Sequence, residues 1–153
     1  MSVLNRYRKP GGFLQLLQLV ETSQPAKQEK LLQAIRNEDP DWADLVENKM
    51  INPDMVFSWD DETLTLIFES MLSRHSAILF KIQGDEFTGR VKNMMRAEKF
   101  KDIRDILEHM ADPLEAEVIS AKNHMLETVR KMDEEKVILL RRIDPNLDLS
   151  DAA

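Results

Sequence analysis

The clearest pattern of hydrophobic and polar positions covers residues 98–110. Apolar side chains recur there at helical spacing, at Phe100, Ile103, Leu107 and Met110. The charged positions of this segment are Glu98, Lys99, Lys101, Asp102, Arg104, Asp105 and Glu108. The pattern predicts an amphipathic helix that rests on a core and shows a row of mixed charges to water. Most such rows are simple solvated faces, and the alternative is that the row is itself a working surface.

Two pairs of opposite charge are expected along this helix at i, i+4 spacing, Lys101–Asp105 and Arg104–Glu108. Exposed pairs of this kind stabilise a helix by only about 0.3–0.5 kcal/mol each. Stability is therefore a weak reason for them.

Helical spacing of apolar residues also covers residues 13–52. Ser23 is a candidate N-cap with Pro25 in the following first turn, and Asp39-Pro40 repeats this arrangement. Short helices with brief links favour antiparallel neighbours, so we expect a small armadillo-like helical lobe. The apolar residues that are expected to line this lobe are Phe13, Leu16, Leu17, Val20, Leu31, Ile35, Trp42 and Leu45.

Residues 53–140 continue the helical pattern after a break at Ile51-Asn52-Pro53. Asp60-Asp61, preceded by Ser58, marks a helix start where negative charge favours capping. Asp112-Pro113 precedes a long final helix. No stretch alternates with the period of two that a half-buried strand needs. The predicted fold class is all-α.

The two ends of the chain offer little to bury. Residues 1–12 contain three basic side chains followed by Pro10-Gly11-Gly12, a strong helix breaker. They fit a flexible basic arm with a Gly-Gly linker, either disordered or acting as a hinge. Residues 141–153 combine Pro145 with scattered acids, and we expect a flexible tail there.

The composition of the chain limits the kinds of partner and environment that we expect for it. The 153 residues include 21 Lys and Arg against 28 Asp and Glu, which gives a net charge of −7. The chain therefore lacks the basic excess that general binding to nucleic acid needs. It has no cysteine for disulfides or thiolate metal sites. No apolar run reaches the about 18 residues of a membrane-spanning helix, and the first residues lack a signal-peptide core, so we expect a soluble cytoplasmic chain.

Residue groups typical of catalysis or metal binding do not occur in the sequence. The histidines at positions 75, 109 and 124 are far apart and have no cysteine or HExxH partner, so we interpret them as surface or helix-end imidazoles. Neither a glycine-rich phosphate loop nor a GxSxG motif is present. We predict that the chain is not an enzyme and holds no cofactor and no metal.

One longer segment resembles a known family. Residues 34–64 combine a helix that ends at Met50, a short loop, the pair Asp60-Asp61 and an amphipathic helix. This order and spacing resemble the C-terminal part of the FliG family of flagellar motor switch proteins. Gly11-Gly12 falls where the family has a Gly-Gly linker, and Asp112-Pro113-Leu114 resembles its Gly-Pro-Val turn before the last long helix.

The resemblance implies an all-α, armadillo-like right-handed superhelix of short helices, with two small lobes joined by a hinge formed by Met50, Ile51, Asn52 and Pro53. In the family the charged helix is a torque-bearing ridge that meets charges on the cytoplasmic loop of the stator subunit MotA. It implies a non-catalytic rotor component at the cytoplasmic face of the inner membrane, in the flagellar basal body. The implied partners are a MotA-like stator loop, FliM-like and FliF-like rotor proteins, and neighbouring copies of the chain. Because lobes of adjacent subunits stack in the family, the resemblance implies that the apolar stripe of residues 13–50 stacks on a neighbouring copy where it stays exposed.

Carried over by position, the resemblance implies a partner-binding ridge made of Lys81, Arg96, Glu98, Lys101, Arg104, Asp105, Glu108 and Glu115. Lys81 aligns with a lysine beside the ridge, and Asp105 aligns with the first of two paired acids. Ile106 occupies the position of the second acid. Glu98 and Glu115 stand where the family has arginine. The surface offered to a stator therefore differs in polarity from that of the family.

Two departures keep a second function open. The family's Met-Phe-x-Phe hinge is Met50-Ile51-Asn52-Pro53 here, which loses both aromatic rings and gains a stiff proline. The family's N-terminal and middle domains, which dock FliG to FliF and FliM, have no counterpart in the sequence, so it corresponds to a fragment or to a short paralogue. The alternative is a divergent helical adaptor of the same fold without a role in motility.

Overall fold

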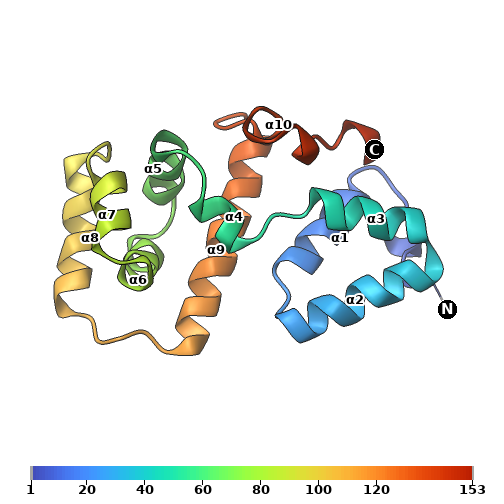
Figure 1. Ribbon diagram of the computed structural model, residues 1–153, viewed down its shortest axis with the longest axis horizontal. Helices are drawn as coiled ribbons and strands as arrows, with labels where there is room; N and C mark the ends of the chain where they lie inside the picture. Colours follow the sequence, from blue (N-terminus) through green and yellow to red (C-terminus); the bar gives the residue numbers. More distant parts are fainter. Residues whose placement is uncertain (1, 153) are drawn as a thin grey trace. The chain divides into compact units, whose positions relative to one another are not determined.

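The computed structural model describes residues 2–152, and over that span the chain is all-α, with no strand (Figure 1). The predicted fold class is confirmed. The chain divides into two compact units. Unit 1 comprises Met1–Asn52 together with Leu139–Ala153, and unit 2 comprises Pro53–Ile138. The chain therefore passes between the units twice.

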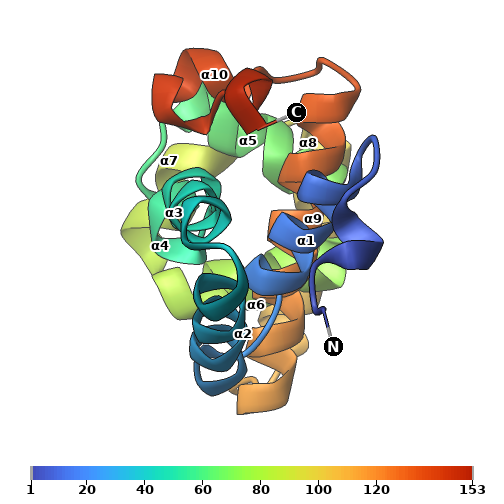
Figure 2. The same ribbon diagram turned by 90° about the vertical axis from the view of Figure 1, so that its right-hand side faces the viewer.

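The body of unit 1 consists of α1 (Gly12–Glu21), α2 (Pro25–Glu38) and α3 (Pro40–Lys49). α2 and α3 run back along one another, and α1 packs against α2 (Figures 1 and 2). Proline occupies the first turn of α2 and of α3, where its missing N–H costs no helical hydrogen bond. The core of unit 1 consists of Leu4, Phe13, Leu16, Leu17, Val20, Ile35, Ala43, Val46 and Ala152.

The N-terminal arm folds onto unit 1, where the sequence led us to expect a flexible segment. The backbone N–H groups of Val3 and Leu4 donate to the Glu38 carboxylate at 3.0 and 2.9 Å. Leu4 is fully buried. A short 3-10 helix, η1 (Asn5–Tyr7), then packs beside α1. One buried leucine and one carboxylate are enough to hold the arm, and neither stands out in the sequence.

The two glycines of the arm serve a tight turn and a close contact. Gly11 has a φ of 78°, in the left-handed region that favours glycine. At Gly12 a Cβ atom would overlap the backbone carbonyl of Tyr7. Both glycines therefore lie within unit 1, where the sequence led us to expect a linker.

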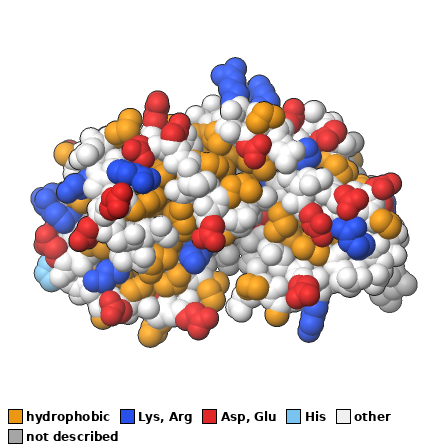
Figure 3. Space-filling model, viewed as in Figure 1, with side chains coloured by type: hydrophobic (Ala, Val, Ile, Leu, Met, Phe, Trp, Pro, Cys, Tyr) orange, Lys and Arg blue, Asp and Glu red, His pale blue; other side chains and the backbone are white. Residues whose placement is uncertain are grey.

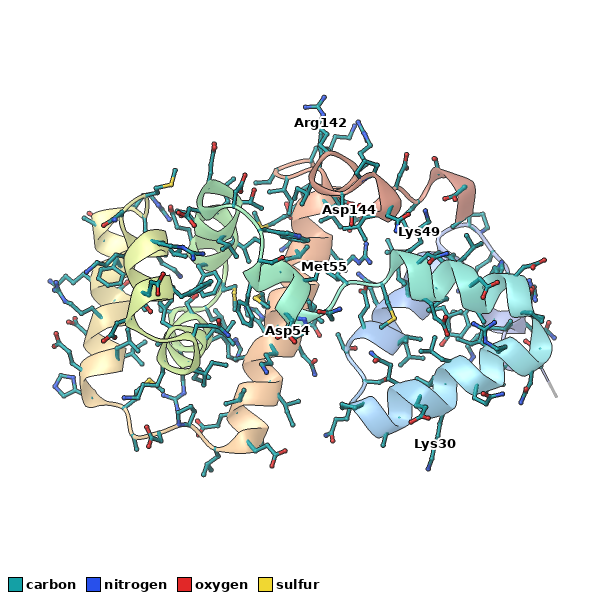
Figure 4. All side chains as sticks on the ribbon, viewed as in Figure 1. Lys30, Lys49, Asp54, Met55, Arg142 and Asp144 are labelled. Carbon is teal, nitrogen blue, oxygen red and sulfur yellow. The ribbon has the colours of Figure 1, made fainter. Side chains whose placement is uncertain are left out.

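The C-terminal segment also packs on unit 1, where we expected a flexible tail. Its elements are α10 (Leu140–Ile143) and the 3-10 turns η2 (Pro145–Leu147) and η3 (Ser150–Ala152). η2 lies against α3, and Leu147 is buried. The Lys49 ammonium, at the end of α3, donates to the carbonyl of Asn146 at 2.9 Å and pairs with Asp151 at 3.2 Å (Figure 4). Contacts this distant in sequence leave no local pattern.

Unit 2 is built from α4 (Pro53–Phe57), α5 (Asp61–Ser70), α6 (Ser73–Gln83), α7 (Asp85–Lys92), α8 (Ala97–His109) and α9 (Glu115–Glu134). α6 packs against both α8 and α9, and α5 packs against α7 and α9 (Figure 1). The Phe68 and Phe80 rings are stacked with centroids 4.7 Å apart, and Phe87 meets Phe57 edge to face at 5.6 Å. This aromatic cluster joins α4, α5, α6 and α7, which contribute one ring each.

Two hydroxyl residues near predicted helix starts do not cap the helices that follow. The hydroxyls of Ser23 and Ser58 donate back to carbonyls of the preceding turn, at 2.7 and 2.6 Å. α5 is instead capped by Asp60, whose carboxylate accepts a hydrogen bond from the Thr63 N–H at 2.9 Å. The prediction that this acid has a capping role is confirmed.

Candidate functional site

Helix α8 buries one narrow side and leaves most of its surface in water. Ile103 is fully buried, and Phe100, Ile106 and Leu107 are half-buried on the same side. The helix rests mainly on α6. The orientation is the one predicted from the sequence, because the apolar stripe points to the core of unit 2.

The charged side chains of α8 are mostly exposed and sparsely paired. Arg104 and Glu108 approach to 3.8 Å, with 51% and 59% of their side-chain surfaces exposed. Such a pair contributes little to stability because water screens it. The predicted pair Lys101–Asp105 does not form, and neither side chain has another ion-pair partner within residues 2–152. In Figure 3, positive and negative side chains alternate along the left-hand edge, where Figure 1 places α8.

Two further ridge residues gather where α8 ends. Lys81 lies on the last turn of α6, and its ammonium is 4.0 Å from the carboxylate of Asp112, in the loop between α8 and α9. Asp112 is 95% exposed, so this contact is weak. Glu115 is the exposed first residue of α9. Lys81 therefore lies beside the loop that follows α8, and Glu115 lies at the far end of that loop.

Two cations near the start of α8 are engaged elsewhere. The Arg96 guanidinium contacts the Glu69 carboxylate of α5 at 2.6 Å. The Lys99 ammonium donates to the Met71 carbonyl at 2.6 Å, and burial lowers the pKa of Lys99. The helical periodicity of the sequence could not distinguish the engaged side chains of Arg96 and Lys99 from the exposed Lys101, because all three lie outside the apolar stripe.

Comparison with known proteins decides the family. The FliG C-terminal domain family matches residues 33–140, which is more than half of the chain. The chain belongs to this family. It is also 21% identical over 140 residues to the flagellar motor switch protein FliG of Thermotoga maritima. That match covers 92% of the chain and 42% of the relative, so the chain spans less than half of the relative's length. The resemblance to FliG inferred from the sequence is confirmed.

The segment that resembles the FliG hinge, residues 50–53, meets the boundary between the two units. Ile51 is fully buried in unit 1, and its N–H donates to the Glu21 carboxylate at 2.7 Å. Glu21 is itself only 5% exposed. Pro53 begins α4 in unit 2. Ile51 is therefore held to unit 1, and unit 2 begins two residues later.

Most of the apolar stripe that we expected to stack on a neighbouring FliG-like copy is already used inside unit 1. The members buried in the core are Phe13, Leu16, Leu17, Val20 and Ile35. Leu31, Trp42 and Leu45 are half-buried at the edge of that core. Only these three can take part in a contact with a neighbouring copy.

The sequence did not predict one pairing in this FliG-type unit 2. The rings of His75 on α6 and His124 on α9 lie with their centroids 4.4 Å apart. His75, in the first turn of α6, and His124 are half-buried and lie ring against ring, whereas His109 is exposed. The packing of α6 on α9 brings the two rings together. Within residues 2–152, no three His, Cys, Asp or Glu side chains are arranged to hold a metal ion.

In the described part of the chain, no helix combines the length and the apolar surface needed to cross a lipid bilayer.

Proposed function

We propose that the chain is a non-catalytic rotor component of a flagellar motor switch, and that α8 engages the charged cytoplasmic loop of a MotA-like stator subunit. The observation that carries this proposal is the exposed, sparsely paired row of charges on α8 in a chain of the FliG C-terminal domain family. On this proposal the chain works in the cytoplasm, at the inner-membrane face of the basal body.

The charges of α8 suit a contact that forms and breaks repeatedly. Lys101 and Asp105 are exposed and have no ion-pair partner within residues 2–152, so a stator charge would not have to displace an existing one. Exposed ion pairs are weak and are screened over about 8–10 Å at physiological salt. A weak contact releases quickly, which a rotating rotor requires.

The support beneath α8 suits the transmission of force. Ile103 anchors the helix in the core of unit 2, and α6 packs against both α8 and α9. A sideways push on the exposed charges is therefore passed to two neighbouring helices. Close-packed interiors transmit strain with little compression. We propose that the whole of unit 2 moves as one body when α8 is pushed.

The mixed polarity of the surface predicts the kind of loop it meets. Lys81 and Lys101 are positive, whereas Glu98, Asp105 and Glu115 are negative, and all five are exposed. We propose that the stator loop presents charges of both signs, so that each step of rotation exchanges one set of opposite pairs for the next.

We further propose that neighbouring copies contact one another through the edge of unit 1. Leu31 and Leu45 are half-buried there, at the edge of the core of unit 1. This apolar edge is small, so the association is expected to be weak and dependent on concentration. Sedimentation velocity over a range of concentrations, comparing the chain with Leu31→Ser, measures it. A purely monomeric chain at every concentration contradicts this part of the proposal.

The experiment that tests the stator contact is motility in the source organism. A deletion strain is compared with strains that carry Asp105→Lys, Lys81→Glu or, as a control, Lys30→Glu. Lys30 is an exposed lysine that extends away from α2 in unit 1 (Figure 4). We expect deletion to leave assembled flagella that do not turn, the two ridge variants to slow rotation, and the control to swim normally. Normal swimming of all four strains contradicts the motor function.

That last result would favour the alternative, a helical adaptor of the same fold without a role in motility. The anchored Ile51 and the proline at position 53 are the observations on its side, because they restrict the hinge of the family.

A further inference from the structure

Unit 1 carries an apolar groove of about 650 Å³ between the N-terminal arm, α3 and the C-terminal segment. The half-buried side chains that form its floor are Tyr7, Leu14, Trp42 and Leu149. The Trp42 ring is held edge to face against Phe13, with centroids 5.6 Å apart and planes at 85°. Because the floor packs directly on the core of unit 1, the groove is formed before any ligand binds.

The charges at the rim of this groove are all positive. The Arg8 guanidinium lies over the Trp42 ring at 4.6 Å from its centroid, and it is fixed there by an ion pair with Asp39 at 3.0 Å. Lys9 is exposed and forms no ion pair within residues 2–152. No carboxylate lines the groove among the described residues. Of the two cations that line the groove, Arg8 is already paired with Asp39 and Lys9 has no ion-pair partner within residues 2–152.

We propose that this groove docks a short amphipathic helix of a partner protein, which inserts apolar side chains onto the floor and places acidic side chains beside Arg8 and Lys9. An apolar floor of this size can accept the apolar face of an amphipathic helix, and the cationic rim favours acidic flanks by charge complementarity. A small polar molecule fits less well, because the groove has no buried polar side chain to orient it.

This site goes beyond the stator contact and does not depend on it. The groove belongs to unit 1, whereas the charged helix α8 belongs to unit 2. Loss of either interaction leaves the residues of the other unchanged. Failure of one proposal is therefore distinguishable from failure of the other.

The test uses the full chain and a synthetic helical peptide of about 16 residues, with leucine at i, i+3, i+4 and i+7 and glutamate on both flanks. A second peptide carries lysine in place of every glutamate. Fluorescence anisotropy of the labelled peptides gives affinity, and amide and indole chemical shifts of the protein give location. We expect the acidic peptide to bind more tightly, with shifts at Trp42 and in residues 7–14 and 149–152.

Matched substitutions distinguish the effect of the rim charges on peptide affinity from the effect of the overall charge of the chain. Lys9→Glu is expected to weaken binding of the acidic peptide by about fivefold, because it reverses one rim charge. Lys30→Glu makes the same charge change on α2, away from the groove, and is expected to leave the affinity unchanged (Figure 4). Leu149→Ser, which removes part of the floor, is expected to weaken binding of the peptide as well.

Several results would overturn the proposal. These are equal affinity for the acidic and basic peptides, equal effects of Lys9→Glu and Lys30→Glu, shifts confined to other residues, and no binding at about 1 mM peptide. Shifts at Trp42 that grow with protein concentration in the absence of peptide would show that a second copy of the chain occupies the groove, and would equally contradict the proposed occupant.

Discussion

The imidazole rings of His75 and His124 pack against each other in unit 2, with centroids 4.4 Å apart and planes inclined at 48°. The His124 Nε2 accepts a hydrogen bond from the Leu72 N–H at 3.4 Å, which requires that nitrogen to be unprotonated. Burial and the neighbouring His75 ring lower the pKa of His124, against an opposing effect of Glu127. The packing of α6 on α9 therefore favours a neutral His124.

This pairing predicts that unit 2 loses stability in mild acid. The pKa of His124 is lower in the folded chain than the value of 6.5 expected when unfolded, so the unfolded state binds the proton more readily. The free energy of unfolding should be constant above pH 6.5 and fall as the pH drops below it, until the folded-state pKa is reached. Denaturant unfolding at a series of pH values measures this.

Two variants test whether His124 causes this loss of stability. His124→Gln should flatten the dependence just below pH 6.5, whereas His109→Gln, at an exposed position, should leave it unchanged. Carboxylates such as Glu117, whose pKa is lowered by the Leu114 N–H and by Arg74, contribute only at more acidic pH. An unchanged pH profile in His124→Gln would show that the ring pair does not control stability.

The close contact at Gly12 predicts opposite effects of one substitution at two glycines. Gly12→Ala should destabilise unit 1 by about 1–3 kcal/mol, because the new methyl group overlaps the Tyr7 carbonyl and displaces the arm. Gly89→Ala, in the middle of α7 with open space around it, should stabilise unit 2 by about 0.5–1 kcal/mol. Amide hydrogen exchange, followed separately for each unit, checks both. Equal effects at the two positions would contradict the folded arm.

The contact between α3 and the C-terminal segment predicts a local loosening on substitution. Lys49→Met should cost about 1–3 kcal/mol, because it removes the charge-assisted hydrogen bond that the nearly buried Lys49 ammonium donates to the Asn146 carbonyl. Asp151→Asn should change the stability little, since that side chain is 61% exposed. Faster hydrogen exchange at Leu147 and Ala152 in Lys49→Met alone is the expected result. Unchanged exchange there would show that apolar burial by itself holds the segment.

The helices and their buried faces could be predicted because they are local properties. The stripe from Phe100 to Leu107 has the period of a helix, and Asp60 has the chemistry of a cap, so short stretches of sequence define them. The charged face of α8 was predictable in the same way. The local pattern could not show which cations of α8 are hydrogen-bonded to other parts of unit 2. Lys99, for example, donates to the carbonyl of Met71, which lies outside α8.

The parts that could not be predicted depend on contacts far apart in sequence. Leu4 is buried where its N–H donates to Glu38, and Leu147 is buried next to the carbonyl that Lys49 contacts. The rings of His75 and His124 meet only because α6 packs on α9. In each case few apolar residues lie nearby, so local composition resembles a flexible end or a solvated face. Burial of single residues in such segments is decided by the fold as a whole.

The most direct test of the account is a reciprocal charge reversal across the proposed stator contact. Asp105→Lys in the chain is combined with reversal of single basic residues in the cytoplasmic loop of the stator subunit, and the rotation of tethered cells is measured. Asp105 has no ion-pair partner within residues 2–152, so its reversal should not affect folding. The account predicts slow rotation with either change alone and recovery with one matched pair. The role of α8 as the stator-facing surface would be contradicted if Asp105→Lys by itself rotated normally and no combination with a stator variant restored rotation.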